Sequence, residues 1–383
     1  MQKVEKFIPL SRPTISKDSI DEVVGVLKSG WLATGPLTQK FEQKLSAYFE
    51  GRPALCFSSA TAGLQAALIA IGVKEGDEVV TTPMTFVATA NVIAALGAKP
   101  VFVDVDRGTF NIDPNHIYDA CTSKTKAIMP VHYAGMPVDL DPIYEIAQMR
   151  GLRVIEDAAH AFGTYYKDRK IGAFGDMQVF SFHPIKNMTS GEGGCVVLDP
   201  KSEQKILELQ RFHGIDRPIW DRFSKNGIRD YDVIFPGGKS NMSDVQAAIG
   251  IHQLAEVDVL NKRRRYLASR YSYHFDDIKD KIRTQAIPSY ESMHSAHLFP
   301  ICLSDKTKKN NFMAFLKDNM IGATPYYTPV HLFSYYQKTF GYKKGDFPNA
   351  EYIGERIVCL PLYSGLKEDE QDYVIGVVKK FFE

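Results

Sequence analysis

Short, almost continuous apolar segments recur through the first half of the chain, and they constrain its fold more than any other feature. Seven of them have the length of a strand, namely Ala54–Ser58, Glu78–Thr81, Val101–Val105, Ala127–Val131, Arg153–Glu156, Gln178–Phe182 and Gly194–Leu198. Apolar runs without polar alternation are typical of strands that are buried on both faces of a mainly parallel sheet. Because helical patterns lie between them, we predict an α/β fold in which helices sandwich a mainly parallel seven-stranded sheet.

The pattern changes after residue 240. A long helical stretch runs from Ser243 to about Phe275, with apolar residues at helical spacing. It is followed by one or two strands near His297–Leu303, a helix near Lys308–Asp318 and two late helices that end at Phe382. We therefore predict a large α/β domain over residues 1–255 and a smaller α+β domain over residues 256–383, which the long helix joins.

Charge and hydropathy narrow the classes of partner. The chain has 46 Lys and Arg against 45 Asp and Glu, which gives no electrostatic reason to expect a nucleic acid or a membrane as partner. The one dense basic run, Lys262–Arg265, is interpreted as the solvated face of a helix. The segment Met1–Ile20 lacks the pattern of a secretory signal, and the longest apolar stretch, Ala66–Val73, is too short to cross a bilayer. We therefore expect a cytoplasmic protein.

Several enzyme classes lack their signatures in this chain. The five cysteines match no zinc or disulfide framework, so we expect reduced, buried thiols and no metal site. The motifs of metalloproteases, P-loop NTPases and serine hydrolases do not occur. The glycine-rich piece Gly191–Gly194 precedes a strand, whereas a dinucleotide-binding fingerprint follows one. This disfavours a nicotinamide-dependent dehydrogenase.

Three predicted strands end in groups that carry chemistry. The fifth runs into Asp157, the sixth continues to Lys186, and the first leads into Ser58–Thr61, which opens a helix. Ligands bind at the carboxyl ends of the strands in such sheets, so these groups are expected to converge. Pyridoxal 5'-phosphate (PLP) needs a lysine for its aldehyde, a carboxylate for its ring nitrogen and backbone N–H groups for its phosphate. Phe86, near another strand end, is a candidate to stack on the ring.

One long stretch of the chain reads VIEDAAHAFGTYYKDRKIGAFGDMQVFSFHPIKNMTSGEGG, from Val154 to Gly194. It resembles the core motif of one known family, the DegT/StrS-type sugar aminotransferases. Further motifs match in order along the chain, at Ser29–Glu42, Thr81–Ile93, Val131–Ile143, Asn241–Gly250 and Phe347–Tyr363. The resemblance covers nearly the whole chain and implies a PLP-dependent transferase of fold type I. It also implies that Lys186 forms the Schiff base, that Asp157 pairs with the pyridine nitrogen and that Phe86 stacks on the ring.

The resemblance assigns the other cofactor contacts too. Ser181, Ala60 and Thr61 match residues that bind the phosphate, and Asn241 matches an asparagine that reaches the phosphate from the other subunit of a homodimer. His160 occupies a position that is often glutamine and contacts the ring hydroxyl. Ala60 departs from the usual glycine, which requires an ordinary φ angle at that position.

The implied reaction moves an amino group from an amino acid, L-glutamate in our interpretation, to a nucleotide-linked keto sugar. We expect a 4-keto-6-deoxy hexose, in surface-glycan biosynthesis such as that of lipopolysaccharide, or in related amino-sugar biosynthesis. The candidate substrate contacts lie in the segments Gly30–Gly35 and Tyr326–His331, with Thr34 and His331 singled out. Two alternatives keep the scaffold. A PLP-dependent sugar dehydratase has a histidine in place of Lys186, and a non-catalytic PLP-binding regulator is disfavoured by the intact Lys186, Asp157 and Ser181.

Overall fold

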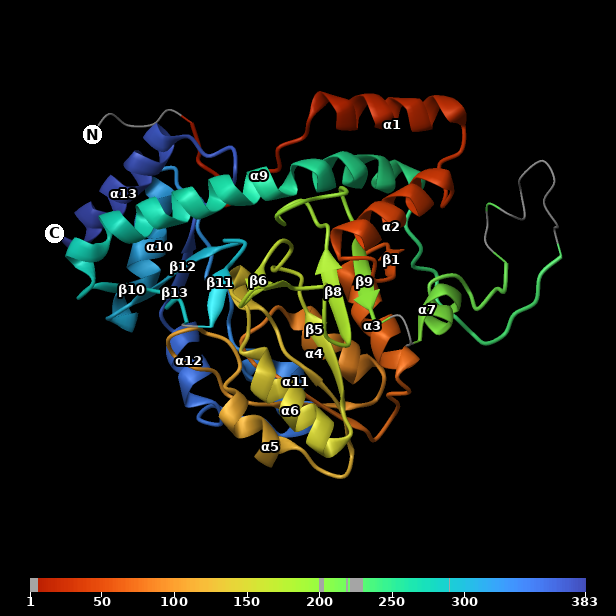
Figure 1. Cartoon of the computed structure of the whole chain (residues 1–383). Coiled ribbons are helices and arrows are strands. Elements are labelled where there is room, and N and C mark those ends of the chain that lie inside the picture. The colour runs from red at the N-terminus through yellow and green to blue at the C-terminus, as the bar shows by residue number, and fades with distance from the viewer. Residues whose placement is uncertain (1–5, 200–202, 218–219, 221–229, 289) are drawn as a thin grey trace.

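A seven-stranded sheet forms the centre of the computed structural model, which describes residues 6–199, 203–217, 220, 230–288 and 290–383 (Figure 1). Its strand order is β1-β9-β8-β5-β4-β2-β3. The strands are β1 (Ala54–Phe57), β2 (Glu78–Thr81), β3 (Lys99–Phe102), β4 (Thr125–Met129), β5 (Arg153–Asp157), β8 (Met177–Ser181) and β9 (Gly194–Leu198). Neighbours run parallel, except that β9 is antiparallel to both β1 and β8. The prediction of a mainly parallel α/β sheet is confirmed.

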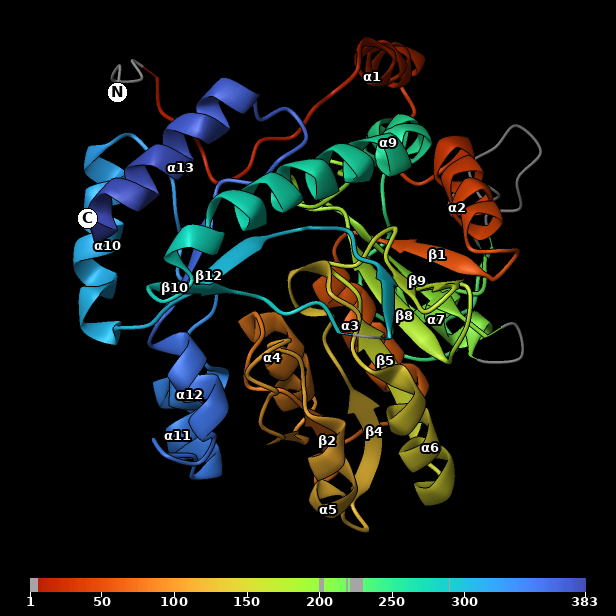
Figure 2. The ribbon, with the colours of Figure 1, turned by 60° about the vertical axis from the view of Figure 1, so that its left-hand side comes forward.

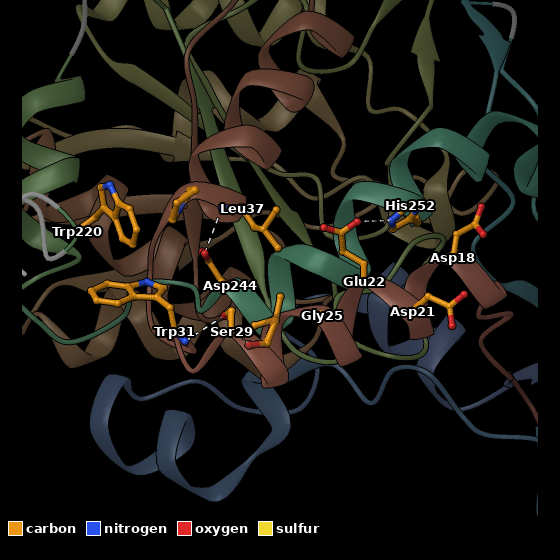
Figure 3. Close-up of a pocket in the computed structure, with 12 residues that line it drawn as sticks. Asp18, Asp21, Glu22, Gly25, Ser29, Trp31, Leu37, Trp220, Asp244 and His252 are labelled. Atoms are coloured by element: carbon orange, nitrogen blue, oxygen red, sulfur yellow. Dashed lines mark hydrogen bonds and ion pairs between the residues drawn. The ribbon is translucent and has the colours of Figure 1, made fainter. Parts of the chain in front are cut away.

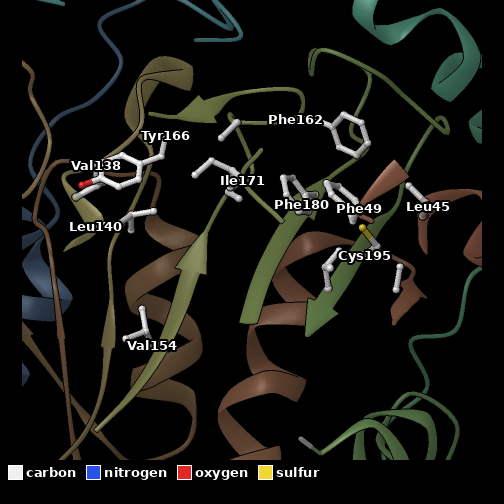
Figure 4. Close-up of a cluster of buried hydrophobic side chains, with 14 of the residues drawn as sticks. Leu45, Phe49, Val138, Leu140, Val154, Phe162, Tyr166, Ile171, Phe180 and Cys195 are labelled. Atoms are coloured by element: carbon white, nitrogen blue, oxygen red, sulfur yellow. The ribbon is translucent and has the colours of Figure 1, made fainter. Parts of the chain in front are cut away.

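Helices pack on both faces of this sheet. One face is covered by α2 (Pro36–Tyr48), α6 (Leu140–Arg150) and α9 (Asp244–His274), and the other by α3 (Ala60–Ala70), α4 (Val87–Ala95) and α7 (Gln204–Gln210). Neighbouring residues of a strand belong to opposite cores: Val154 lies in the first (Figure 4) and Ile155 in the second. This double burial explains why the strand sequences are almost continuously apolar.

A second unit has its own core. Its antiparallel sheet has the order β10-β12-β13, with β10 at Ile282–Thr284, β12 at Phe299–Leu303 and β13 at Ile357–Leu360. Helices α10 (Lys309–Asp318) and α13 (Glu368–Phe382) pack with it (Figure 2). Ile8 is buried in the same core and pairs with Ile321, so the N-terminal segment lies against the C-terminal part of the chain.

The 31-residue helix α9 is shared by the two cores. Ser243 and Gln246 form a capping box at its start, which explains why the helix begins where the sequence predicts. Its first half contributes Ile251 to the core of the large sheet, and its second half contributes Tyr271 to the smaller core. The predicted boundary between residues 255 and 256 falls inside this helix, and the division into two domains there stays a prediction.

One interpretation of the sequence is wrong at Arg264, which belongs to the basic run expected on a solvated helix face. The side chain is only 3% exposed, and its guanidinium donates to the carbonyl oxygens of His297 and Leu362. Burial lowers the pKa of Arg264 to about 10. The guanidinium of Arg264 is therefore surrounded by backbone carbonyl oxygens, and not by water as the sequence suggested.

The remaining elements complete the two units. They are α1 (Lys17–Ser29), α5 (Ile117–Ala120), α11 (Ser334–Phe340) and α12 (Pro348–Gly354), with a third antiparallel sheet of β11 (Glu291–Met293), β6 (Tyr165–Tyr166) and β7 (Arg169–Lys170). Helix α1 lies along α9 (Figure 1). All five cysteines are buried and free, as predicted. Within the described residues, none of the helices has the length and apolar character that crossing a membrane requires.

Candidate active site

The carboxyl ends of three strands meet at one cavity of about 310 Å³. Asp157 ends β5, Ser181 ends β8, Lys186 follows β8 in the next loop, and the start of α3 follows β1. The cavity brings together residues that the sequence predicted to hold a cofactor, namely Ala60, Thr61, Phe86, Asp157, His160, Ser181 and Lys186. An amine, a carboxylate, hydroxyl groups and a helix N-terminus therefore share one space.

Lys186 supplies the amine of the cavity. A hydrogen bond of 2.9 Å from its backbone N–H to the carbonyl oxygen of His183 closes the turn that carries it. Burial lowers the pKa of Lys186 to about 8, and the carboxylate of Asp157 opposes this shift. An amine with this pKa is partly neutral near pH 7, which is the form that attacks an aldehyde.

Asp157 supplies the carboxylate and is held by two hydrogen bonds. Its Oδ2 accepts from the hydroxyl of Thr89 at 2.7 Å, and its Oδ1 accepts from the backbone N–H of Ala159 at 3.1 Å. The hydroxyl of Thr89 also forms a hydrogen bond of 2.7 Å with the hydroxyl of Thr85. Burial raises the pKa of Asp157, and the two donated hydrogen bonds oppose that rise by stabilising the charged form. This fixes the carboxylate in the cavity in one orientation.

The start of α3 lies beside Ser181 and offers an anion site. Ser59 caps the helix by accepting from the N–H of Ala62, and Ala60 has ordinary helical backbone geometry. The departure from glycine at Ala60 therefore needs no left-handed conformation. Gly194 on β9 is required instead, because a Cβ there would lie 2.5 Å from the backbone nitrogen of Ala60. Free N–H groups at a helix start bind phosphate well.

His160 presents a defined donor to the cavity. Its Nδ1 lies 3.3 Å from the backbone nitrogen of Ala134. Because that N–H group can only donate, Nδ1 is the acceptor. Burial lowers the pKa of His160 well below its usual range, so the neutral ring carries its single proton on Nε2. That nitrogen is 3.3 Å from the hydroxyl oxygen of Tyr327. The backbone of Ala134 thus determines the tautomer that sequence alone left open.

Aromatic side chains line the entrance. Phe86, at the N-terminal end of α4, is 55% exposed, and its ring centroid is 6.0 Å from that of Tyr327. Tyr327 and Tyr326 come from the C-terminal part of the chain and complete the lining. The two tyrosines belong to the segment Tyr326–His331, which the sequence predicted to contact the substrate. Thr89 was not predicted, because a threonine one turn into a helix gives no local signal for a shared site.

Three predicted site residues do not line this cavity. Asn241 donates to the hydroxyl of Thr34, and both residues border a separate hollow of about 230 Å³. His331 is fully buried, with its Nε2 2.9 Å from Oε1 of Glu351. The resemblance places Asn241 at the site of a partner subunit, so its position within one chain neither supports nor opposes that role.

A larger hollow of about 760 Å³ lies between α1, α2 and α9 (Figure 3). Its lining contains none of the residues predicted for the cofactor. Asp244 on its wall accepts from the backbone N–H groups of Gly35, Leu37 and Thr38, so it caps the start of α2. We interpret this carboxylate as structural, because every hydrogen bond to it comes from the α2 region.

The chemistry of the 310 Å³ cavity, which contains Lys186 and Asp157, fits PLP. The amine, the carboxylate, the aromatic ring and the helix start each match one part of the cofactor. A metal centre has no comparable support, since no group of three or more His, Cys, Asp or Glu residues in the described ranges could hold a metal ion.

Comparisons with known proteins agree with this geometry. A relative from Bacillus subtilis, the spore coat polysaccharide biosynthesis protein SpsC, is 43% identical over 383 residues, which cover 99% of this chain and 98% of the relative. Spr1654 of Streptococcus pneumoniae, solved in its PLP form, superposes with a TM-score of 0.89 at 32% identity, covering 98% of this chain and 99% of that one. Sugar aminotransferase CalS13 from Micromonospora echinospora superposes with a TM-score of 0.87 at 30% identity, covering 97% and 99%.

A match to a whole family carries more weight than any single relative. The profile of the DegT/DnrJ/EryC1/StrS aminotransferase family matches residues 13–379. The match covers the long helix, every residue of the cavity and both cores except Ile8. The chain therefore belongs to the DegT/DnrJ/EryC1/StrS aminotransferase family and is a PLP-dependent aminotransferase of fold type I.

Proposed function

We propose that this aminotransferase moves an amino group from L-glutamate to a nucleotide-linked keto sugar, most specifically a 4-keto-6-deoxy hexose. The observation that carries the proposal is the pairing of the Lys186 amine and the Asp157 carboxylate in one cavity. The sugar class rests on the similar proteins: CalS13 is a sugar aminotransferase, and SpsC takes its name from polysaccharide biosynthesis. We therefore place the reaction in surface-glycan biosynthesis, of which lipopolysaccharide synthesis is one form.

Each residue of the cavity has a defined task in this reaction. PLP, when bound, supplies an aldehyde that holds the amino group and a ring that accepts electron density. Lys186 would hold the cofactor at rest and then, as a free amine, would move the proton from the amino-acid Cα to the cofactor carbon that carries the transferred nitrogen. Asp157, fixed by Thr89 and Ala159, keeps a proton on the ring nitrogen.

The other cavity residues bind and orient. His160 would donate its Nε2 proton to the ring hydroxyl, and Ser181 and the N–H groups around Thr61 would hold the phosphate. Phe86, which lines the cavity, would stack on the ring. These groups do not take part in proton transfer, so their removal should weaken cofactor binding more than it changes the reaction itself.

We further propose a homodimer with shared active sites. The proposal rests on the family resemblance, which places Asn241 at the phosphate of a neighbouring subunit; within their own chain, Asn241 and Thr34 lie outside the cavity. Exposed apolar side chains on α1, namely Ile20, Val24 and Leu27, recur at helical spacing and suit a subunit interface. Substrate contacts of Thr34 and His331 stay predictions. The cytoplasmic location that we propose is supported by the five free cysteines.

The test uses purified protein, L-glutamate and a panel of nucleotide-linked 4-keto sugars, with the product identified by mass. We expect an amino sugar from at least one member of the panel. Lys186→Ala should abolish both the visible absorbance of the lysine-bound cofactor and turnover, because no other amine lines the cavity among the described residues. Full turnover by this variant would overturn the assignment. A deoxygenated sugar without incorporated nitrogen would indicate the dehydratase instead.

A further inference from the structure

A second histidine, His297, packs against the ring of His160. The ring centroids of His160 and His297 are 4.3 Å apart with planes 33° from parallel, and His297 is 2% exposed. His297 comes from the segment that leads into β12, in the smaller unit. Its Nδ1 lies 2.9 Å from Oδ1 of Asn187, the residue that follows Lys186 in the chain. The smaller unit thus touches the lysine loop through this ring.

The protons in this contact can be assigned from the hydrogen bonds. The amide nitrogen of Asn187 donates to Oδ1 of Asn261 at 2.7 Å and to the carbonyl oxygen of Ser295 at 2.8 Å. A carbonyl only accepts, so the amide oxygen of Asn187 must face His297. Nδ1 of His297 therefore carries the proton and donates it. Burial lowers the pKa of His297 well below its usual range, so the ring is neutral and Nε2 is a bare acceptor.

That bare nitrogen is costly. Nε2 of His297 is buried and has no hydrogen-bond partner among the residues that the structure describes. A phenyl ring would fill the same space and remove this unpartnered nitrogen, but it would leave Oδ1 of Asn187 without the donor that Nδ1 supplies. The Nδ1 proton of His297 is the feature that a phenyl ring would not supply.

Two hydrogen bonds hold the backbone of His297 in place. Its backbone N–H donates to the carbonyl oxygen of Ala134 at 3.0 Å, and its own carbonyl oxygen accepts from Arg264 at 3.3 Å. Ala134 is the residue whose N–H orients His160. Gly135 permits this close approach, because a Cβ there would lie 2.2 Å from Oγ of Ser295 and 3.2 Å from the backbone nitrogen of His297. The ring therefore has little freedom to move independently of the site.

We propose that His297 is a positioning residue for the aminotransferase reaction: its Nδ1 proton holds Asn187, and through it the Lys186 backbone, while its ring supports His160. The inference rests on the proposed role of Lys186. Asn261 and Arg264, one turn apart on α9, hold the same cluster, so the long helix helps to set where the lysine amine lies. A displacement of a reacting group by about 1 Å can cost about 100-fold in rate.

The test compares variants that separate the donor from the ring. His297→Phe keeps an aromatic ring against His160 and loses the Nδ1 proton, whereas His297→Asn places an amide N–H near the position of Nδ1. His294→Phe is the matched control, since His294 receives a hydrogen bond from Ala296 and makes none to Asn187. Two readouts use the PLP-loaded protein: the rate at which L-glutamate removes the visible absorbance, and the pH at which that absorbance changes without substrate.

We expect His297→Phe to bind PLP, to react with L-glutamate roughly 10- to 100-fold more slowly and to shift the pH midpoint. His297→Asn should recover most of the rate, and His294→Phe should match the unmodified protein. Asn187→Ala should be slow as well. The double variant, Asn187→Ala with His297→Phe, should be no slower than the slower single variant, because both substitutions remove the same hydrogen bond between Asn187 and His297.

Three outcomes would overturn the proposal: an unchanged rate and pH midpoint in His297→Phe, equal losses in His297→Phe and His297→Asn, or losses that multiply in the double variant. If His297→Phe does not fold, the comparison of Asn187→Ala with His297→Asn decides, since only the first should be slow. A failure of the proposed function is distinguishable, because Lys186→Ala would then retain the visible absorbance, whatever the result at His297.

Discussion

The amine of Lys186 should titrate far below an ordinary lysine, and this can be measured before the sugar is known. Burial lowers its pKa from the ordinary 10.5 to about 8, while the Asp157 carboxylate pulls in the opposite direction. The difference, 10.5 minus about 8, is about 2.5, so at pH 7 the neutral amine is about 300 times more abundant than in an exposed lysine. Capture of an aldehyde needs the neutral form, so it should be faster in proportion.

The assay follows the capture of PLP by the apoprotein through the visible absorbance of the lysine-bound cofactor, over a series of pH values. We expect the rate to rise with pH and to level off above about 8. Asp157→Asn is the matched variant, because loss of the carboxylate that raises the pKa of Lys186 should move the midpoint to lower pH. A midpoint near 10.5, or a higher one in Asp157→Asn, would refute the reasoning.

The same shift ties the stability of the apoprotein to pH. Lys186 releases its proton near pH 8 in the folded chain and near 10.5 in the unfolded chain, so the unfolded chain binds more protons between these values. Stability should therefore rise with pH across this window, by about 3 kcal/mol. Lys186→Met, which does not titrate, should be more stable below pH 8, and its advantage should shrink as the pH rises. A constant difference in thermal unfolding would contradict the shift.

Three further substitutions test the surroundings of the site. Gly135→Ala forces a Cβ to within 2.2 Å of Oγ of Ser295 at a residue with φ of +91°, and should cost about 2–4 kcal/mol in denaturant unfolding. Thr89→Val removes the hydroxyl that donates to Asp157 and should raise the pKa of that carboxyl further; the rate with L-glutamate should fall about tenfold, with Thr89→Ser close to normal. Asp244→Ala leaves the first N–H groups of α2 without their acceptor and should cost about 3 kcal/mol, against a smaller loss in Asp244→Asn.

The sequence predicted the sheet and its reactive edge well, because both depend on local patterns. Strands buried on two faces must be apolar throughout, and the groups that follow them must lie at one edge of the sheet. Asp157 and Lys186 were accessible to this reasoning for that reason, whereas Ser181 was predicted from the family resemblance; all three line the cavity.

Contacts between distant segments could not be predicted in the same way. Thr89 reaches Asp157 from inside a helix, and Tyr327 reaches His160 from the C-terminal part of the chain. The tautomer of His160 depends on a backbone N–H at Ala134, which no side-chain pattern reveals. Arg264 looks like one of four solvated charges until the fold places carbonyl oxygens around it.

The long helix α9 also limits how the chain can be divided. Because one continuous helix of 31 residues supplies side chains to both cores, a fragment that stops at residue 255 would lack Val257 of the large-sheet core, and its complement would lack Ile8 of the smaller core. Neither fragment should fold alone, and unfolding should occur as one event for both units. Limited proteolysis should therefore spare the middle of α9 until the entire molecule opens.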